Sequence, residues 1–401
     1  MYRLARRTAS KVRHRVNAAM EKWRLADLYS PDHSDLDESR HIAAAVGWLK
    51  RAQDAGSDRG VSYGVRFGSD FQESYPETTG YICRTFVELS KSNNDEELFY
   101  RAVEMGDWEA RIQLPSGAVM GGKLNLTPTP AIFNTGMVLL GWSALIRAGM
   151  GKQFIAPATR AADWMLSTQE PDGNWIRGNS SYALPGATVY NVKAAWGLGD
   201  LGAALGREDY LRSAIRNAEF CLRQQRPNGW FRNCCLSNPA EPLLHTVAYT
   251  MEGLIGIGEL SGRREFIDAA RTTADAQLRV LRPDGFLPGR QDADFRPAVD
   301  WCCLTGSAQT SIVMSKLHGL TGARKYADAA VLINRYLMAH HDIRNTDSRL
   351  HGGVPGSWPV WGAYGRFTIL NWATKFLLDA LRLQPDTEAL SDERTGTSRP
   401  H

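Results

Sequence analysis

A short turn motif recurs along this chain at a constant interval. Its four copies read QLPSGAV, QEPDGNW, QRPNGWF and LRPDGFL. The glycines of successive copies are 56 residues apart, at Gly117, Gly173, Gly229 and Gly285. A fixed period of this length predicts repeated supersecondary units that stack around one shared core.

Two kinds of helix alternate around these turns. Segments before the turns, such as 207–225, combine an apolar stripe with many charges, which is typical of helices with one solvent-exposed face. Segments after the turns, such as 244–261, carry few charges and many small residues, as buried helices do. Extending this phase predicts outer helices at 40–54, 96–113, 152–169, 207–225, 263–281 and 323–340. The predicted inner helices lie at 76–92, 131–149, 187–205, 244–261, 303–319 and 366–383.

Six such hairpins close most economically as a ring, so we predict an all-α fold, the (α/α)6 toroid. The links from inner to outer helices are short, whereas those from outer to inner helices are long. Long loops inside a compact domain are usually functional. We therefore expect the functional site at the face where the inner helices begin.

The two ends of the chain differ from this repeat in composition. We predict a basic amphipathic helix and linker over 1–39, the toroid over 40–383 and a disordered polar tail over 384–401. The first 25 residues hold eight Lys and Arg against the single acid Glu21, while the whole chain carries a net charge of only +4. Because little positive charge is left for the toroid, a nucleic-acid partner is not expected.

The basic N-terminal segment has two interpretations. It could dock on an anionic membrane surface or a glycosyltransferase, or it could be a solvated helix packed on the barrel. The sequence contains neither a secretory h-region nor a membrane-spanning apolar run. We expect a cytoplasmic protein that can be peripheral to the inner face of the membrane.

Four longer motifs carry a resemblance to a known family. They are YPETTGYI (75–82), GWFRNC (229–234), PLLHTVAYTMEGL (242–254) and GGVPGSWPVWGAYGRFTILNWATKF (352–376). With the six-hairpin pattern, they resemble the six-hairpin glycosidase-like superfamily, and within it bacterial proteins of exopolysaccharide and capsule gene clusters. The resemblance spans about residues 40–383 and implies the (α/α)6 fold and carbohydrate metabolism. The superfamily includes hydrolases, lyases and epimerases, so fold alone does not fix the reaction.

His245 and Tyr249 are the first candidate catalytic pair. His245 begins an inner helix, and Tyr249 follows one turn later on the same face. Such a pair can abstract the proton next to a uronate carboxylate, as a lyase or C5-epimerase requires. Asn191, Arg232 or Arg290 could neutralise that carboxylate. The structural alternative is a histidine that only holds hydrogen bonds in a packed toroid.

Glu77 and Asp300 are the alternative pair, for a glycoside hydrolase. Glu77 opens the first inner helix, and Asp300 lies in a long loop before the fifth inner helix. The separation of the two carboxyl groups would decide between retention and inversion of configuration. Helix capping alone would also explain Glu77.

The candidate saccharide-binding residues share a position in the long loops or at the starts of inner helices. Aromatic rings there can stack on sugar faces, and polar groups can orient an acidic oligosaccharide. These candidates are Tyr75, Asn134, Trp175, Tyr190, Asn191, Trp230, Arg232, Arg290, Trp301, Trp358 and Tyr364.

Two further classes of protein stay open, and no cofactor is expected. Zinc has candidate ligands on the expected functional face, but they lack the CxxC spacing typical of zinc sites. The PDGxW turns resemble the QW motifs of terpene cyclases, although the DxDD acid motif is missing. A non-catalytic glycan-binding scaffold also fits the sequence. The cysteines, expected to be reduced, are Cys83, Cys221, Cys234, Cys235, Cys302 and Cys303.

Overall fold

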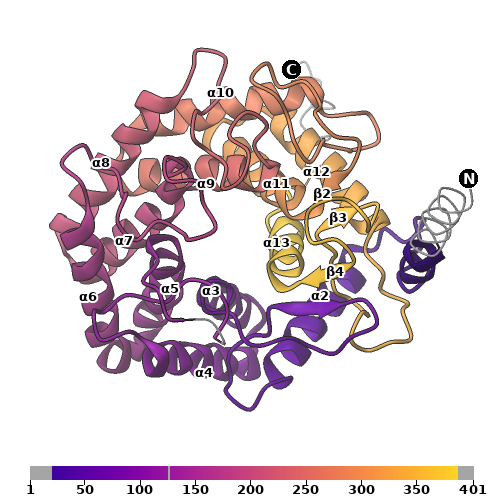
Figure 1. Cartoon of the computed structure of the whole chain (residues 1–401), viewed down its shortest axis with the longest axis horizontal. Helices are drawn as coiled ribbons and strands as arrows, with labels where there is room; N and C mark the ends of the chain where they lie inside the picture. Colours follow the sequence, from indigo (N-terminus) through magenta and orange to yellow (C-terminus); the bar gives the residue numbers. More distant parts are fainter. Residues whose placement is uncertain (1–19, 125–126, 387–401) are drawn as a thin grey trace, which may run out of the picture.

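The computed structural model describes residues 20–124 and 127–386, which form two concentric rings of helices (Figure 1). The outer ring contains α2 (Glu38–Asp54), α4 (Glu96–Ile112), α6 (Gly151–Thr168), α8 (Glu208–Gln224), α10 (Arg264–Val280) and α12 (Arg324–Ala339). The inner ring contains α3 (Pro76–Asn93), α5 (Ile132–Leu145), α7 (Val192–Leu205), α9 (Leu244–Ser261), α11 (Leu304–Thr321) and α13 (Asn371–Arg382). The predicted (α/α)6 toroid is confirmed.

Three inner-helix boundaries differ from the prediction. The third inner helix begins with the 3-10 turn Val189–Asn191 instead of at 187. The second continues into a π-helical turn, Ile146–Met150. The last starts later than 366, because Thr368–Leu370 forms strand β4 and pairs with β1 (Gly64–Arg66).

Two short antiparallel pairs of strands fasten the loops of the functional face. β1 pairs with β4, so the loop before the first inner helix is joined to the loop before the last. β2 (Cys302–Cys303) pairs with β3 (Ser357–Trp358) and joins the fifth and sixth loops. The β1–β4 pair holds the first and last hairpins together at the point where the ring closes (Figure 1).

Burial separates the two rings as the composition predicts. Every residue of α9 from Leu244 to Gly258 is buried, whereas α8 buries only one stripe along its length. Small residues let inner helices approach closely, since a Cβ on Gly197 of α7 would lie 2.0 Å from the carbonyl oxygen of Gly136 on α5. Inner helices therefore form the packed wall of the toroid.

The repeated turn motif joins successive outer helices. Gly173 has a φ of +89°, and a Cβ there would lie 2.3 Å from the carbonyl oxygen of Arg216 on α8. The amide of Gln169, in the same copy of the motif, donates to the carbonyl oxygens of Gly173 and Ser213 at 3.1 and 3.0 Å. The close approach at Gly173 and the hydrogen bonds of Gln169 make the same connection, in which the turn after one outer helix rests on the backbone of the next.

A fifth glycine makes the same kind of contact where the ring closes, although it does not follow the 56-residue period. Gly352 has a φ of +75°, and its Cβ would lie 2.3 Å from the carbonyl oxygen of Ala44 on α2. The turn after the last outer helix thus rests on the first one. Its interval from Gly285 differs from 56 because α12 is followed by a longer connection before the turn.

We expect Gly173→Ala to destabilise the fold much more than Gly206→Ala. Both glycines have positive φ, but nothing lies within 4 Å of a Cβ at Gly206. The control should cost about 1 kcal/mol for the backbone alone, and Gly173→Ala about 3 kcal/mol, because the methyl group also displaces α8. Urea unfolding measures both. Equal losses would mean that the turn does not act as a joint between helices.

The N-terminal segment is described only from residue 20. Residues 20–26 are helical, and the ring of Trp23 packs edge-on against Trp361 at 5.7 Å. Trp23 stays 59% exposed. The rest of the predicted basic helix, and most of the predicted tail, lie outside the described residues. Among the residues described, no helix is both long and apolar enough to cross a membrane.

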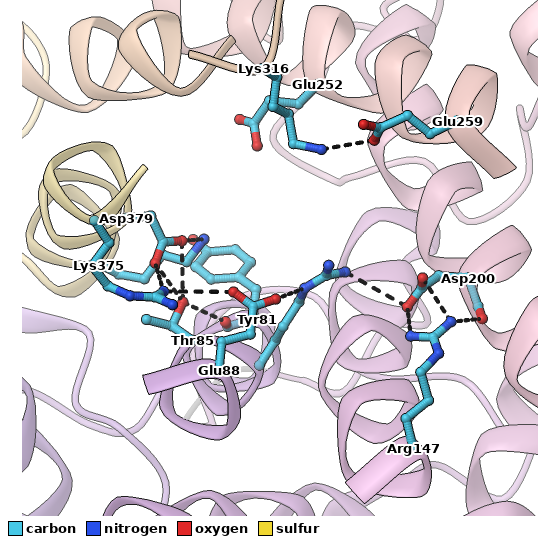
Figure 2. Close-up of polar contacts among 12 residues, drawn as sticks. Tyr81, Thr85, Glu88, Arg147, Asp200, Glu252, Glu259, Lys316, Lys375 and Asp379 are labelled. Carbon is cyan, nitrogen blue, oxygen red and sulfur yellow. Dashed lines mark hydrogen bonds and ion pairs between the residues drawn. The ribbon is translucent and has the colours of Figure 1, made fainter. Parts of the chain in front are cut away.

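Charged side chains of several inner-ring helices form ion pairs with one another (Figure 2). Lys316 of α11 pairs with Glu259 of α9 at 2.9 Å, and Arg147 pairs with Asp200 of α7 at the same distance. Lys375 and Asp379 of α13 pair at 2.8 Å. The side chains of Lys375 and Asp379 are only 8% and 12% exposed, and buried charges of this kind require partners.

Candidate active site

A cavity of about 340 Å³ opens at the face where the inner helices begin. It is lined at the starts of α3, α5, α9 and α13 and by the long loops, as the loop lengths predicted. This volume is typical of a site for a small molecule or one end of a larger one. The lining residues are Tyr63, Tyr75, Glu77, Gly122, Lys123, Phe133, Asn134, Ser180, Tyr182, Tyr190, Leu236, Leu243, His245, Thr246, Tyr249, Tyr364 and Trp372.

Aromatic rings form one wall of this cavity. Trp372 meets Tyr63 edge-to-face at 4.8 Å and lies 6.0 Å from the ring of Tyr75. Its indole N–H donates to the hydroxyl oxygen of Tyr364 at 2.7 Å, which fixes both side chains. Flat apolar faces with polar edges of this kind suit the C–H faces and hydroxyl groups of a sugar ring.

Glu77 brings a carboxyl group into the aromatic cavity. It lies in the first turn of α3, directly after Pro76, and the hydroxyl of Tyr75 donates to its Oε2 at 3.2 Å. Burial raises the pKa of Glu77 from the ordinary value of 4.5 to about 7. Near neutral pH a large fraction of this group therefore carries a proton that it can donate.

His245 provides a neutral base in the same cavity. It is only 7% exposed, and burial lowers its pKa from 6.5 to about 4. Its Nδ1 is hydrogen-bonded to Oε1 of Gln309, and its ring lies 4.2 Å from the ring of Tyr249. Burial raises the pKa of Tyr249 well above 10, so its hydroxyl keeps its proton.

Three of the predicted binding residues line the cavity together with Tyr75. Asn134 is held by its amide, which donates to the carbonyl oxygen of Met120 at 3.0 Å. Tyr190 donates its hydroxyl to Oδ1 of Asn179 at 2.8 Å, and Tyr364 is held by Trp372. Asn191 lies next to this group but is fully buried and does not line the cavity.

The predicted pair of carboxylates is not assembled. Asp300 lines a different hollow, together with His340 and Trp358. Glu77 is the one carboxyl group that lines the central cavity among the described residues. Trp358, in strand β3, lines this second hollow and not the central cavity.

Three other predicted tryptophans anchor loops instead of lining the cavity. Trp175 is fully buried and donates its indole N–H to the carbonyl oxygen of Met165 at 2.9 Å. Trp230 packs against Phe295 with ring centroids 5.9 Å apart. Trp301 is 8% exposed and fills the space beside Gly289. Each ring covers apolar surface on the barrel, which is the ordinary role of large buried aromatics.

The cationic side chain at the cavity is a lysine and not one of the predicted arginines. Arg232 is exposed and does not line the cavity, and Nη1 of Arg290 donates to the carbonyl oxygen of Glu241 at 2.7 Å. Lys123, in the loop before α5, is the cationic side chain there, with its Nζ 4.3 Å from the centre of the Tyr63 ring. Sequence reasoning missed Lys123, Tyr63 and Trp372, whose only signal was that the first two lie in long loops and the third at the start of an inner helix.

Four of the six cysteines, Cys234, Cys235, Cys302 and Cys303, were candidate ligands for the alternative zinc site. All six are buried free thiols, and the thiols of Cys234 and Cys302 contact the hydroxyls of Thr250 and Ser307. Within residues 20–124 and 127–386, no three His, Cys, Asp or Glu side chains cluster closely enough to hold a metal ion.

Several solved structures share this fold. An unsaturated glucuronyl hydrolase from Bacillus sp. GL1 is 15% identical, with a TM-score of 0.67 over 86% of this chain and 96% of that one. A cellobiose 2-epimerase from Bacillus thermoamylovorans B4167 is 9% identical, with a TM-score of 0.69 over 86% and 98%. A D-mannose isomerase is 14% identical, with a TM-score of 0.66 over 88% and 99%. The toroid fold implied by the resemblance is confirmed. No protein-family model and no curated protein sequence matches the chain.

Proposed function

We propose that the protein is a carbohydrate-active enzyme that abstracts a carbon-bound proton from one sugar unit of its substrate. His245 is the general base and Glu77 the general acid. The observation that carries this proposal is that a neutral histidine and a carboxyl group with a raised pKa line the same small aromatic cavity. Because the two pKa values are separated, the base is unprotonated and the acid protonated at the same pH, as general acid–base catalysis requires.

The reaction requires a proton next to a carbonyl or carboxylate group. Nε2 of His245 takes that proton, and Glu77 gives its own proton to the carbonyl or carboxylate oxygen as the enol forms. Return of a proton to the same carbon gives an epimer, and its delivery to the neighbouring carbon gives an isomer. In the elimination, the C–O bond at the next carbon breaks, the leaving oxygen takes the proton held by His245, the enol returns its proton to Glu77, and an unsaturated sugar is left. Tyr249, the partner of His245 in the predicted pair, keeps its proton because burial raises its pKa, and we assign it the role of a hydrogen-bond donor to the substrate.

The substrate class follows from the lining of the cavity. Trp372, Tyr63 and Tyr75 offer stacking faces, and Lys123 offers one positive charge for a carboxylate. A saccharide with an acidic unit fits these groups. Solved proteins of the same fold are described as acting on unsaturated glucuronides and cellobiose, which supports a sugar substrate.

The setting of the reaction is also a proposal. The motif resemblance favours surface-polysaccharide metabolism in the cytoplasm, with a lipid-linked or free acidic oligosaccharide as substrate. Residues 1–25, rich in Lys and Arg, would then hold the enzyme near anionic lipid or a glycosyltransferase. A hydrolase of the two-carboxylate type is disfavoured, because Asp300 does not share the cavity with Glu77.

The test is a product assay on a panel of aldoses, uronic acids and uronate-containing oligosaccharides, followed by NMR and ultraviolet absorbance. We expect an epimer, an isomer or an unsaturated uronate from the natural protein. His245→Gln should abolish the product, and Asp300→Asn should retain it. Release of new reducing ends without any of these products would replace the proposal with glycoside hydrolysis.

The pH profile of kcat/KM should be bell-shaped, with its limbs near pH 4 and pH 7. Activity needs His245 neutral, which holds above its pKa of about 4, and Glu77 protonated, which holds below its pKa of about 7. Rates measured from pH 3.5 to 9 check this. A profile that keeps rising above pH 8 would mean that Glu77 does not act as the acid.

A further inference from the structure

Three buried polar residues connect the candidate base to the ion pairs of the toroid interior. Gln309 of α11 contacts His245 through Oε1 and Glu252 through Nε2, the latter at 2.7 Å. The other oxygen of Glu252, Oε2, pairs with Nζ of Lys193 on α7. Gln309 is fully buried, Lys193 is 2% exposed and Glu252 is 6% exposed. The chain of contacts crosses three inner helices.

The donor and acceptor of each hydrogen bond between these residues can be assigned by starting from the charged pair of Lys193 and Glu252. Lys193 has donors and no acceptor, so it requires the carboxylate of Glu252 as acceptor. A carboxylate can only accept, and the group that faces its second oxygen must therefore be the NH₂ of Gln309. With its NH₂ turned to Glu252, Gln309 presents its carbonyl oxygen to His245.

The orientation of Gln309 decides which nitrogen of His245 carries the proton. A carbonyl oxygen accepts, so Nδ1 of the imidazole must be the N–H donor. In a neutral ring, Nε2 then holds the lone pair. Nε2 makes no hydrogen bond within the part of the chain that the structure describes, and the ring lines the cavity.

We infer that Gln309, Glu252 and Lys193 are positioning residues that hold His245 in its Nδ1–H tautomer and leave Nε2 free to accept a proton. The tautomer is a property of the resting protein, and only its catalytic use rests on the proposed function. None of the three residues lines the cavity, so each acts through His245. Gln309 and Glu252 lie one or two turns inside their helices and Lys193 lies in the first turn of α7, so no shared position in the sequence pointed to them.

The test reads the tautomer directly. The full chain is labelled with ¹⁵N at histidine, and long-range ¹H–¹⁵N correlations are recorded at pH 7 without any ligand. The spectrum of His245→Gln identifies the His245 signals by their loss. We expect Nδ1 of His245 to show the shift of a protonated nitrogen and Nε2 that of an unprotonated one.

Gln309→Met removes the carbonyl acceptor at similar side-chain length. We expect the His245 signals to move toward the Nε2–H tautomer, and kcat on the active sugar to fall about 10- to 100-fold with little change in KM. Gln277→Met is the matched control, because Gln277 is also a fully buried glutamine, paired with Gln291 on the outer ring at 2.9 Å. It should leave tautomer and kcat unchanged.

The outcomes separate the two proposals. A protonated Nε2 in the natural protein, or a tautomer that Gln309→Met leaves unchanged, overturns the positioning role even if the enzyme is active. The expected tautomer and its expected change in Gln309→Met, in a protein that converts no sugar of the panel, would confirm the positioning of His245 and refute the proposed function.

Discussion

Glu77→Gln is expected to make the protein inactive and, above neutral pH, more stable. The amide cannot donate a proton to the substrate, and loss of a general acid lowers kcat about 10²- to 10⁴-fold. The stability gain has a separate cause. Burial raises the pKa of Glu77 from 4.5 to about 7, so the folded natural protein must ionise a poorly hydrated carboxyl group as pH rises.

The sign of this effect depends on pH. Between pH 4.5 and 7 the folded state binds this proton more tightly than the unfolded state, so stability falls as pH rises through that window. At pH 8 the amide should be more stable than the natural protein by about 2–3 kcal/mol, and at pH 4 the two should be equal. Urea unfolding at both pH values measures the difference.

Asp300→Asn is the matched control for this carboxyl-to-amide change. Asp300 lies on the functional face but outside the central cavity. We expect its activity to be retained and its stability to change by less than about 0.5 kcal/mol at either pH. A Glu77→Gln variant that loses stability at pH 8, or keeps full activity, would contradict the assignment of a buried general acid.

Lys193→Met is expected to cost about 3–5 kcal/mol of folding free energy. Lys193 and Glu252 are both buried and paired, and removal of one partner leaves the other charge uncompensated. Glu252→Met should cause a loss of similar size. The double variant should recover most of it, because two methionines fill the space without any charge.

The matched control is an ion pair on the surface. Arg212 and Glu208 of α8 form an exposed pair with side chains 63% and 88% exposed, so its double-mutant cycle should show almost no coupling. If the losses of folding free energy in Lys193→Met and Glu252→Met simply add up in the double variant, the two side chains do not act as a coupled buried pair. The double variant should also show weakened catalysis despite its recovered stability, because nothing then orients Gln309.

The fold was predictable because its signals are local and repeated. Gly173 needs positive φ and close contact with the next helix, and each copy of the turn repeats this requirement at the same spacing. The segment that forms α9 carries few charges and is buried on all sides from Leu244 to Gly258, whereas α8 carries many charges and buries one stripe, so composition separates the rings. The starts of inner helices then pointed to Glu77, His245 and Tyr249.

The rest of the site depended on distances that no local pattern contains. Trp175 and Trp372 are both tryptophans near a long loop, yet one supports the barrel and the other lines the cavity. Asp300 precedes the fifth inner helix as expected for the functional face, but it lines a different hollow from Glu77. The raised pKa of Glu77 arises from burial by loops distant in sequence.

Incorporation of deuterium from D₂O into the sugar is the most direct measurement of the central claim. Mass spectrometry and NMR follow the sugar that the enzyme converts. We predict deuterium on the carbon next to the carbonyl or carboxylate group, with incorporation lost in His245→Gln. Conversion without any carbon-bound deuterium would contradict proton abstraction by His245.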